Sequence, residues 1–203
     1  MATPLLLQAE HVAKAYAGIP ALRDGRLSLR AGSVHALCGG NGAGKSTFLS
    51  ILMGITARDA GTILLNGAAV QFNRPSEALA SGIAMITQEL EPIPYMSVAE
   101  NIWLGREPRR AGCIVDNKAL NRRTRELLES LEFDVDASSP MHRLSVAQIQ
   151  LVEIAKAFSH DCQVMIMDEP TSAIGEHEAQ TLFKAIRRLT ARDAGIEIGS
   201  AHV

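Results

Sequence analysis

The sequence of 203 residues has little cysteine and no excess of charge of one sign. Its 16 glycines and 8 prolines make up about 12% of the chain, and 47% of the residues are apolar, which excludes collagen-like, low-complexity and disordered classes. Twenty Lys and Arg residues stand against 22 Asp and Glu residues. The net charge therefore creates no overall electrostatic attraction for nucleic acid or an anionic membrane surface. Any anion must be bound by a local site.

The cysteines are too few and too far apart to indicate a disulfide framework or a zinc site. Cys38, Cys113 and Cys162 form no CxxC motif and no Cys/His pair, which favours a reducing compartment. No run of about 18 apolar residues occurs, and no basic segment followed by an apolar one stands at the N-terminus. We therefore expect a protein that is not secreted and does not span a membrane by itself.

The succession of strand-like and helix-like segments predicts an α/β fold. Residues 5–37 alternate over short stretches, which predicts strands joined by hairpins. Short apolar runs, typical of a sheet covered on both faces, follow at residues 62–66, 83–87 and 164–167. Helical spacing occurs at residues 46–53, within residues 97–158, and at residues 176–192. These segments predict a mostly parallel core, an N-terminal antiparallel subsheet and an inserted helical region.

The strongest local motif is the run from Gly39 to Ser46, which satisfies the phosphate-loop pattern G-x-x-x-x-G-K-[ST] between a strand and a helix. Its glycines allow main-chain N–H groups to surround phosphates, Lys45 neutralises the β and γ charges, and the Ser46 hydroxyl ligates Mg²⁺. The candidate nucleotide contacts are Gly39, Asn41, Gly42, Ala43, Gly44, Lys45, Ser46 and Thr47. The alternative is a flexible glycine turn followed by a surface lysine.

A second motif is an apolar strand, residues 164–167, that ends in two carboxylates, Asp168 and Glu169. If this strand lies next to the one before the phosphate loop, Asp168 is positioned to hold Mg²⁺ and Glu169 to orient or deprotonate a water for attack on the γ-phosphate. A salt-bridged strand end is the alternative.

Two serines have the spacing of helix capping boxes. Ser145 with Gln148, and Ser97 with Glu100, fit S/T-x-x-E/Q. For Ser97 we expect capping alone. A capped helix N-terminus is also an anion site, so Ser145 and Gln148 are candidates for phosphate contact as well.

The order of these motifs resembles that of an ABC transporter nucleotide-binding domain: a phosphate loop, then Gln88, then LSVAQ, then MIMDEPTSA. The segments VHALCGGNGAGKST, GIAMITQEL, MSVAENIWLGREP and LSVAQIQLVEIAKAF are similar to the N-terminal half of the ATP-binding subunits of bacterial monosaccharide importers. The resemblance covers residues 5–198. It implies a single domain with a P-loop NTPase core, residues 1–89 and 160–203, and a helical subdomain over about residues 90–159.

The resemblance also implies roles for individual residues. Tyr16 is the aromatic on which adenine stacks, and Gln88 contacts Mg²⁺ or water and senses the γ-phosphate. Ser145 contacts the γ-phosphate of ATP held by another nucleotide-binding domain. His202 is the histidine that hydrogen-bonds the γ-phosphate and Glu169. A half-buried strand tyrosine and a frayed terminal residue are the respective alternatives for Tyr16 and His202.

The chain departs from the family pattern at several places, among them residues 172–175, where the usual loop that meets its counterpart across the dimer is slightly altered. Gly40 stands where the family usually has Glu, at the loop edge. Val146 and Ala147 replace two glycines of the signature, which removes close backbone approach there. Residues 196–201 contain a glutamate and a glycine where an apolar strand is expected, and the chain ends directly after His202. We expect a domain truncated at its C-terminus.

As a whole, the resemblance implies a peripheral ATPase on the cytoplasmic face of the cell membrane that uses ATP and Mg²⁺ to drive import. Its implied partners are a transmembrane permease, a second nucleotide-binding domain later in the same chain and, indirectly, a sugar-binding protein; nucleic acid is not expected. We expect the permease to dock around residues 88–103, with Glu91, Tyr95 and Met96. Two alternatives are a non-catalytic ATP-binding fragment and an ABC-type ATPase with a non-transport role, which the balanced charge disfavours.

Overall fold

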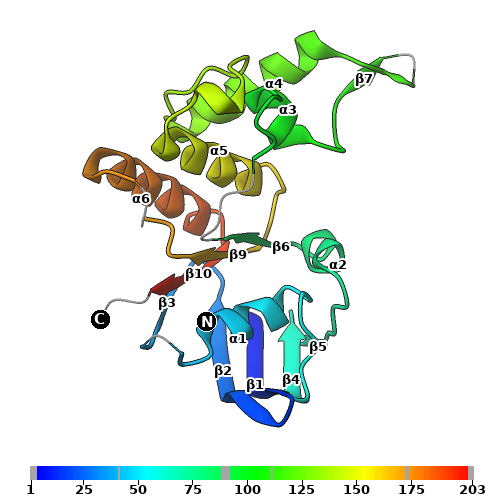
Figure 1. The fold of residues 1–203 in the computed structure, drawn as a ribbon, viewed down its shortest axis with the longest axis vertical. Helices are drawn as coiled ribbons and strands as arrows, with labels where there is room; N and C mark the ends of the chain where they lie inside the picture. Colours follow the sequence, from blue (N-terminus) through cyan, green and yellow to red (C-terminus); the bar gives the residue numbers. More distant parts are fainter. Residues whose placement is uncertain (1–3, 41, 88–91, 111, 172–173, 201–203) are drawn as a thin grey trace. The chain divides into compact units, whose positions relative to one another are not determined.

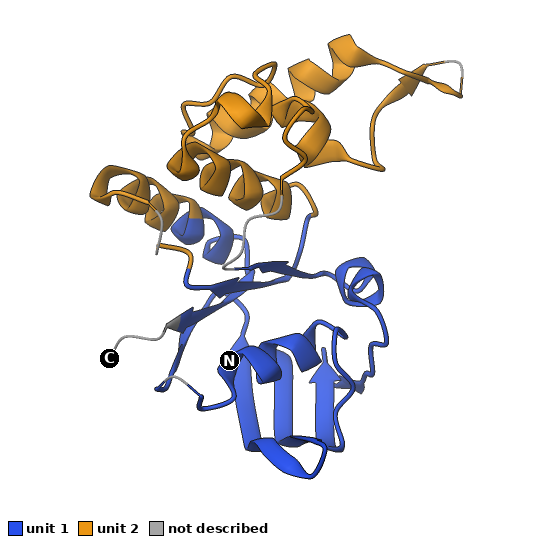
Figure 2. Ribbon diagram, in the orientation of Figure 1, with its two compact units in different colours: residues 1–88, 161–169, 186–203 blue, residues 89–160, 170–185 orange. Residues whose placement is uncertain are grey.

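A computed structural model describes residues 4–40, 42–87, 92–110, 112–171 and 174–200. The chain forms two compact units (Figure 2). Unit 1 comprises residues 1–88, 161–169 and 186–203, and unit 2 comprises residues 89–160 and 170–185. Each unit is therefore assembled from segments that are distant in the sequence.

Unit 1 contains an antiparallel sheet with the strand order β2-β1-β4-β5. Its strands are β1 (Leu5–Tyr16), β2 (Ile19–Arg30), β4 (Ala60–Leu65) and β5 (Ala68–Ala69). The tight β1–β2 turn places Ala17 and Gly18 at φ of 49° and 82°, the left-handed conformation that two-residue hairpins require. The predicted N-terminal hairpin is confirmed.

Unit 1 also contains a parallel sheet with the order β3-β10-β9-β6. Its strands are β3 (Val34–Cys38), β6 (Ile83–Ile86), β9 (Val164–Asp168) and β10 (Gly195–Ser200) (Figure 1). The first four residues of β9 are buried, because strands on both sides and apolar groups on both faces cover them. The glutamate and the glycine within residues 196–201 do not prevent strand formation, since β10 pairs with both β3 and β9.

The core of unit 1 joins both sheets to helix α1 (Lys45–Leu52). Every third or fourth residue of α1 is apolar, and Leu49 and Leu52 are completely buried. The helix ends at Leu52, and Gly54 after it adopts φ of 69° and donates its N–H to the Ile51 carbonyl. A second, shorter helix, α2 (Pro75–Ala80), precedes β6. The apolar cluster includes Leu7, Leu29, Phe48, Leu49, Leu52, Ile63, Val164 and Ile166.

Unit 2 is largely helical. It contains α3 (Val98–Trp103), α4 (Asn117–Leu131), a 3₁₀ turn (Met141–Arg143), α5 (Val146–Phe158) and the first ten residues of α6 (Glu176–Thr190). It also contains a short hairpin, β7 (Arg109–Arg110) and β8 (Ile114–Val115). Both predicted capping boxes are confirmed, at the start of α3 and at the start of α5.

Two polar cross-links tie the helices of unit 2 together. The indole N–H of Trp103 donates to the buried Thr124 hydroxyl at 3.0 Å, which links α3 to α4. The Arg106 guanidinium donates to the Ile102 carbonyl at 3.0 Å and to the Ser159 carbonyl at 3.0 Å, which links the C-terminal ends of α3 and α5. A cation is favourable at helix C-termini. Among the described residues, no helix has the length and apolar character needed to cross a bilayer.

Candidate functional site

The phosphate loop joins the end of β3 to the start of α1. Gly44 is the N-cap residue of α1, with φ of 87° and no capping side chain. Consequently the first-turn N–H groups of α1 keep no acceptor within the helix and are available to a ligand. A Cβ atom at Gly44 would overlap the Ala21 carbonyl oxygen of β2, so this position admits only glycine.

Lys45 extends its ammonium group back over the loop. Its Nζ donates to the Gly39 carbonyl oxygen and, at 3.2 Å, to the Gly40 carbonyl oxygen. The positive charge therefore lies on the concave side of the loop, where phosphate oxygens would be bound. A Cβ at Gly40 would meet nothing within 4 Å, so the side chain that the family usually has there would fit.

The loop and the two carboxylates line one cavity of about 450 Å³ in unit 1. Its lining consists of Ala21, Gly42, Ala43, Gly44, Lys45, Ser46, Thr47, Asp168 and Glu169. The strands that end at Cys38 and Asp168 are not neighbours, because β10 lies between them. Their carboxyl ends nevertheless lie at the same edge of the parallel sheet, so the acidic pair lines the cavity together with the loop although the two strands are not adjacent.

The electrostatics of this cavity fit a divalent cation. Burial raises the pKa of Asp168, the adjacent Glu169 raises it further, and Lys45 lowers it. A cation would favour the ionised form of Asp168, and Ser46 offers a hydroxyl oxygen, a ligand that suits Mg²⁺. No cluster of three His, Cys, Asp or Glu side chains suited to a metal occurs in the described part of the chain. Phosphate oxygens and water would supply the remaining ligands.

Glu169 is held in an uncommon backbone conformation. Its φ is 48°, a left-handed value that is unfavourable for a side chain of this size. Its N–H donates to the Gly199 carbonyl oxygen of β10 at 3.0 Å. A Cβ at Gly199 would lie 3.0 Å from the Asp168 Oδ1 atom, so this glycine leaves room for the Asp168 carboxylate.

Tyr16, the predicted adenine contact, is not among the residues that line this cavity. It is 48% exposed at the end of β1, beside the strand that supplies Ala21. Its ring centroid lies 5.5 Å from the Lys14 ammonium. The predictions for Asn41, Gln88 and His202 fall outside the described residues.

Ser145 and Gln148 lie in unit 2. The Ser145 hydroxyl accepts from the Gln148 N–H at 3.2 Å, and the Gln148 side chain accepts from the Ser145 N–H at 3.0 Å. They line a cavity of about 410 Å³ whose other lining residues are Glu132, Asp134, Leu151, His177, Glu178 and Thr181. Three carboxylates in this lining repel an anion, so within this unit the structure supports the capping role of Ser145.

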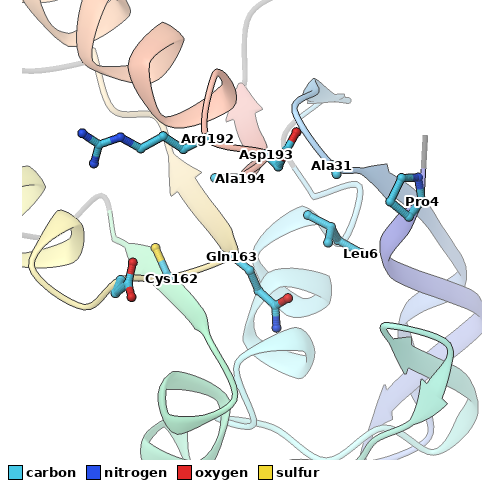
Figure 3. Close-up of a pocket in the computed structure, with 9 residues that line it drawn as sticks. Pro4, Leu6, Ala31, Cys162, Gln163, Arg192, Asp193 and Ala194 are labelled. Carbon is cyan, nitrogen blue, oxygen red and sulfur yellow. The ribbon is translucent and has the colours of Figure 1, made fainter.

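A third cavity, of about 440 Å³, lies at the opposite edge of the parallel sheet in unit 1. Its lining residues precede β9 and β10 or lie near the ends of β1 and β2 (Figure 3): Pro4, Leu6, Ala31, Asp161, Cys162, Gln163, Arg192, Asp193 and Ala194. Burial raises the pKa of the Cys162 thiol to about 11, so this thiol remains protonated and unreactive. The cavity has neither a helix N-terminus nor a lysine, and the chemistry therefore favours the phosphate loop.

The sequence did not identify Ala21 or Gly199 as part of the site. Both contribute through main-chain atoms: the Ala21 carbonyl lies against Gly44, and the Gly199 carbonyl accepts from Glu169. A main-chain contribution leaves no side-chain signal, so only the glycine at residue 199, unusual within a strand, could have drawn attention.

A protein-family model described as "ABC transporter" matches residues 22–172. The structure superposes on the ADP conformation of an ATP-binding cassette of an ABC transporter with a TM-score of 0.85, covering 99% of this chain and 83% of that one. At 24% identity this likeness shows the fold. The fold is thus that of an α/β ATP-binding cassette with a P-loop NTPase core.

Two curated relatives are much closer in sequence. A putative ribose/galactose/methyl galactoside import ATP-binding protein of Pseudomonas syringae is 51% identical over 193 residues, which are 95% of this chain and 37% of the relative. A second such protein, of Burkholderia lata, is 48% identical over 195 residues, which are 96% of this chain and 37% of the relative. The chain thus spans a little over a third of their length. The chain belongs to the ABC transporter family.

Proposed function

We propose that this chain is a nucleotide-binding domain that binds and hydrolyses ATP to power the import of a monosaccharide. The observation that carries the proposal is the single cavity shared by the phosphate loop and two carboxylates. The functions for which the relatives are named, import of ribose, galactose or methyl galactoside, support a sugar as the cargo. The nature of the sugar is a property of the permease and the sugar-binding protein.

In this proposal, residues of this chain bind the phosphates of ATP, neutralise their charge and orient the attacking water. First-turn amides of α1 and the Lys45 ammonium bind the β- and γ-phosphates. Ser46 and Asp168 hold Mg²⁺, which supplies additional neutralisation of phosphate charge. Glu169 orients a water in line with the γ-phosphate and accepts its proton, and its strained backbone keeps the carboxylate at the sheet edge. Gln88 and His202 remain candidates for sensing the γ-phosphate, and Tyr16 remains the candidate for stacking on adenine.

The partners belong to the same proposal. A second nucleotide-binding domain is expected, because the relatives are much longer than this chain and because the resemblance gives Ser145 a role at a site on another domain. We infer that a permease helix docks around residues 88–103, on the cytoplasmic face of the membrane. Tyr95 supports this, since it is 87% exposed and its ring lies 5.5 Å from the His142 ring; Glu91 falls outside the described residues.

Titration calorimetry with ATP and Mg²⁺ tests the binding step. We expect Lys45→Ala to weaken binding at least about a hundredfold, because it removes the charge that faces the phosphates. Lys118→Ala is the matched control, since Lys118 is an exposed lysine on α4 of unit 2, and it should bind like the wild type. A folded wild-type chain that releases no heat with ATP contradicts the proposed function.

Hydrolysis is tested by a second variant. Glu169→Gln should keep the affinity for ATP and lose hydrolysis, because the amide cannot accept the proton of the attacking water. The measurement is phosphate release, followed alongside calorimetry on the same samples. Equal hydrolysis rates for wild type and Glu169→Gln would remove the assigned role of Glu169.

A further inference from the structure

The β7–β8 hairpin of unit 2 exposes two arginines together with two aliphatic side chains. Arg109 pairs with Val115, and Arg110 pairs with Ile114, in an antiparallel register. Ile114 is 51% exposed and Val115 37% exposed, and both arginines are exposed. The hairpin extends away from α3 and α4 within this unit (Figure 1). Packing within unit 2 therefore does not explain why the hairpin carries aliphatic side chains at Ile114 and Val115.

Basic side chains continue from the hairpin into the first half of α4. Lys118, Arg122 and Arg125 are exposed there, and their spacing of four and three residues places them on one side of the helix. Residues 104–125 contain seven basic residues and two acidic ones, although the whole chain has a net charge of −2. The positive charge is thus concentrated on this part of unit 2, which we call the basic hairpin surface: Arg109, Arg110, Ile114, Val115, Lys118, Arg122 and Arg125.

Several charged side chains near this surface make contacts within unit 2. The Arg123 guanidinium lies 3.8 Å from the centroid of the Trp103 ring, and the Asp116 side chain caps α4. The Glu107 carboxylate accepts from the Gly105 N–H at 2.9 Å. The side chains of Arg109 and Arg110, by contrast, form no hydrogen bond or salt bridge with the described residues of the chain, although the charge of Arg109 helps to lower the pKa of Glu107. Their guanidinium groups are available to an external anion.

We propose that the basic hairpin surface binds the anionic phospholipid surface of a bilayer. Guanidinium groups pair with phosphate in a two-pronged geometry, and each Lys or Arg near an anionic membrane strengthens binding about fivefold. Directly paired residues of an antiparallel hairpin lie on the same face. Each face of this hairpin therefore presents one guanidinium beside one aliphatic side chain.

That combination fits a bilayer interface better than an acidic protein or a nucleic acid. Lipid phosphates lie only a short distance from the acyl chains, so on the hairpin face that meets the bilayer the arginine binds a headgroup while the aliphatic side chain beside it reaches the acyl boundary. Nucleic acid would use the charge and leave the aliphatic groups in water, and an acidic protein would need an apolar patch of its own to cover them. This inference rests on the proposed function, in which the domain works against a membrane-embedded permease.

Vesicle flotation tests the inference with the chain alone and without a permease. We expect binding to vesicles of phosphatidylcholine with about 30% phosphatidylglycerol and at least about tenfold weaker binding to pure phosphatidylcholine. Arg109→Glu/Arg110→Glu should lose at least about tenfold in binding to the anionic vesicles. Ile114→Ser/Val115→Ser should also bind more weakly, because the aliphatic insertion is removed. Binding should weaken at about 0.5 M salt.

The matched control is Arg187→Glu/Arg192→Glu, which changes the net charge equally at two exposed arginines of unit 1. It should bind the vesicles like the wild type. Equal loss in this control, equal binding to neutral vesicles, or complete competition by millimolar glycerol phosphate would overturn the inference.

ATP binding separates this inference from the proposed function. The hairpin variants should keep the wild-type circular dichroism and affinity for ATP, and Lys45→Ala should keep the affinity for vesicles. A chain that binds ATP but no vesicle overturns the membrane contact alone. A chain that binds vesicles but no ATP contradicts the proposed function alone.

Discussion

Glu197 of β10 lies opposite Ile166 of β9 in the parallel sheet, with its side chain only 1% exposed. Neither of its carboxylate oxygens has a hydrogen-bond partner among the described residues. Burial raises the pKa of Glu197 from 4.5 to about 7. The protonated acid is therefore the form that the folded chain favours, because burying the ionised form costs more.

The first prediction concerns stability against pH. Because the pKa of Glu197 is higher in the folded state, its contribution favours folding below pH 4.5 and is lost as the pH rises to about 7. The loss amounts to about 3 kcal/mol in the free energy of unfolding. Urea unfolding between about pH 4.5 and 7.5 measures it, as the difference between wild type and Glu197→Gln, which cannot titrate.

The difference in unfolding free energy between wild type and Glu197→Gln isolates the contribution of Glu197 from those of other titratable groups. The pKa of His160 is lowered, mainly by burial, so His160 contributes stability that rises with pH and acts in the opposite direction. Its contribution is the same in both proteins and cancels. Parallel stability curves for wild type and Glu197→Gln would contradict the prediction.

The second prediction concerns Gly44. Gly44→Ala places a Cβ against the Ala21 main chain and imposes φ of 87° on a residue with a side chain. We expect a destabilisation of about 2–4 kcal/mol and a loss of ATP binding, because the loop must shift. Gly67→Ala is the control: Gly67 has φ of 79°, but a Cβ at this position would meet no atom within 4 Å.

Gly67→Ala should therefore show only the backbone penalty, about 1 kcal/mol, and unchanged ATP binding. Thermal unfolding and calorimetry measure both properties. Equal destabilisation by the two substitutions would show that the contact with Ala21 is unimportant.

The third prediction concerns the two capping serines. Ser97→Ala and Ser145→Ala each remove the hydroxyl that accepts the N3 N–H of a helix. Each should lower the free energy of unfolding by about 1 kcal/mol. Neither should change ATP binding by the single chain, since the resemblance places the Ser145 contact on another domain's nucleotide. A tenfold loss of ATP affinity in Ser145→Ala would instead indicate a direct role in this chain's own site.

The fourth prediction concerns Arg106. Arg106→Ala removes hydrogen bonds to the main chain at Ile102 and Ser159, and with them the guanidinium that contacts those helix ends. We expect a destabilisation of about 1–3 kcal/mol in unit 2, seen as faster hydrogen exchange at the ends of α3 and α5. Arg110→Ala, on an exposed hairpin position, should leave exchange at those helix ends unchanged.

Much of the fold could be predicted because local patterns determined it. The helical spacing at Leu120, Thr124, Leu127, Leu128 and Leu131 predicted α4, and all of these residues except the half-buried Leu127 are buried. The β1–β2 hairpin and both capping boxes followed from alternation and short-range hydrogen bonding. These features depend on residues only a few positions apart, so the sequence shows them directly.

The last strand could not be predicted in the same way. Glu197 and Gly199 are poor strand residues, yet β10 forms between β3 and β9, where it gains main-chain hydrogen bonds on both sides. Its conformation is therefore set by neighbours distant in sequence, which outweigh local preference.

The sequence by itself determined the phosphate loop, because glycine, lysine and serine must follow one another in a short span to surround a phosphate. Only the tertiary structure decided that Asp168 and Glu169 share a cavity with that loop, since β10 had to insert between the two strands and bring their carboxyl ends to one edge. Likewise, only folding placed Arg109 beside Val115 and Arg110 beside Ile114 on the two faces of the β7–β8 hairpin, because cross-strand pairing, and not their order in the chain, brought each pair together.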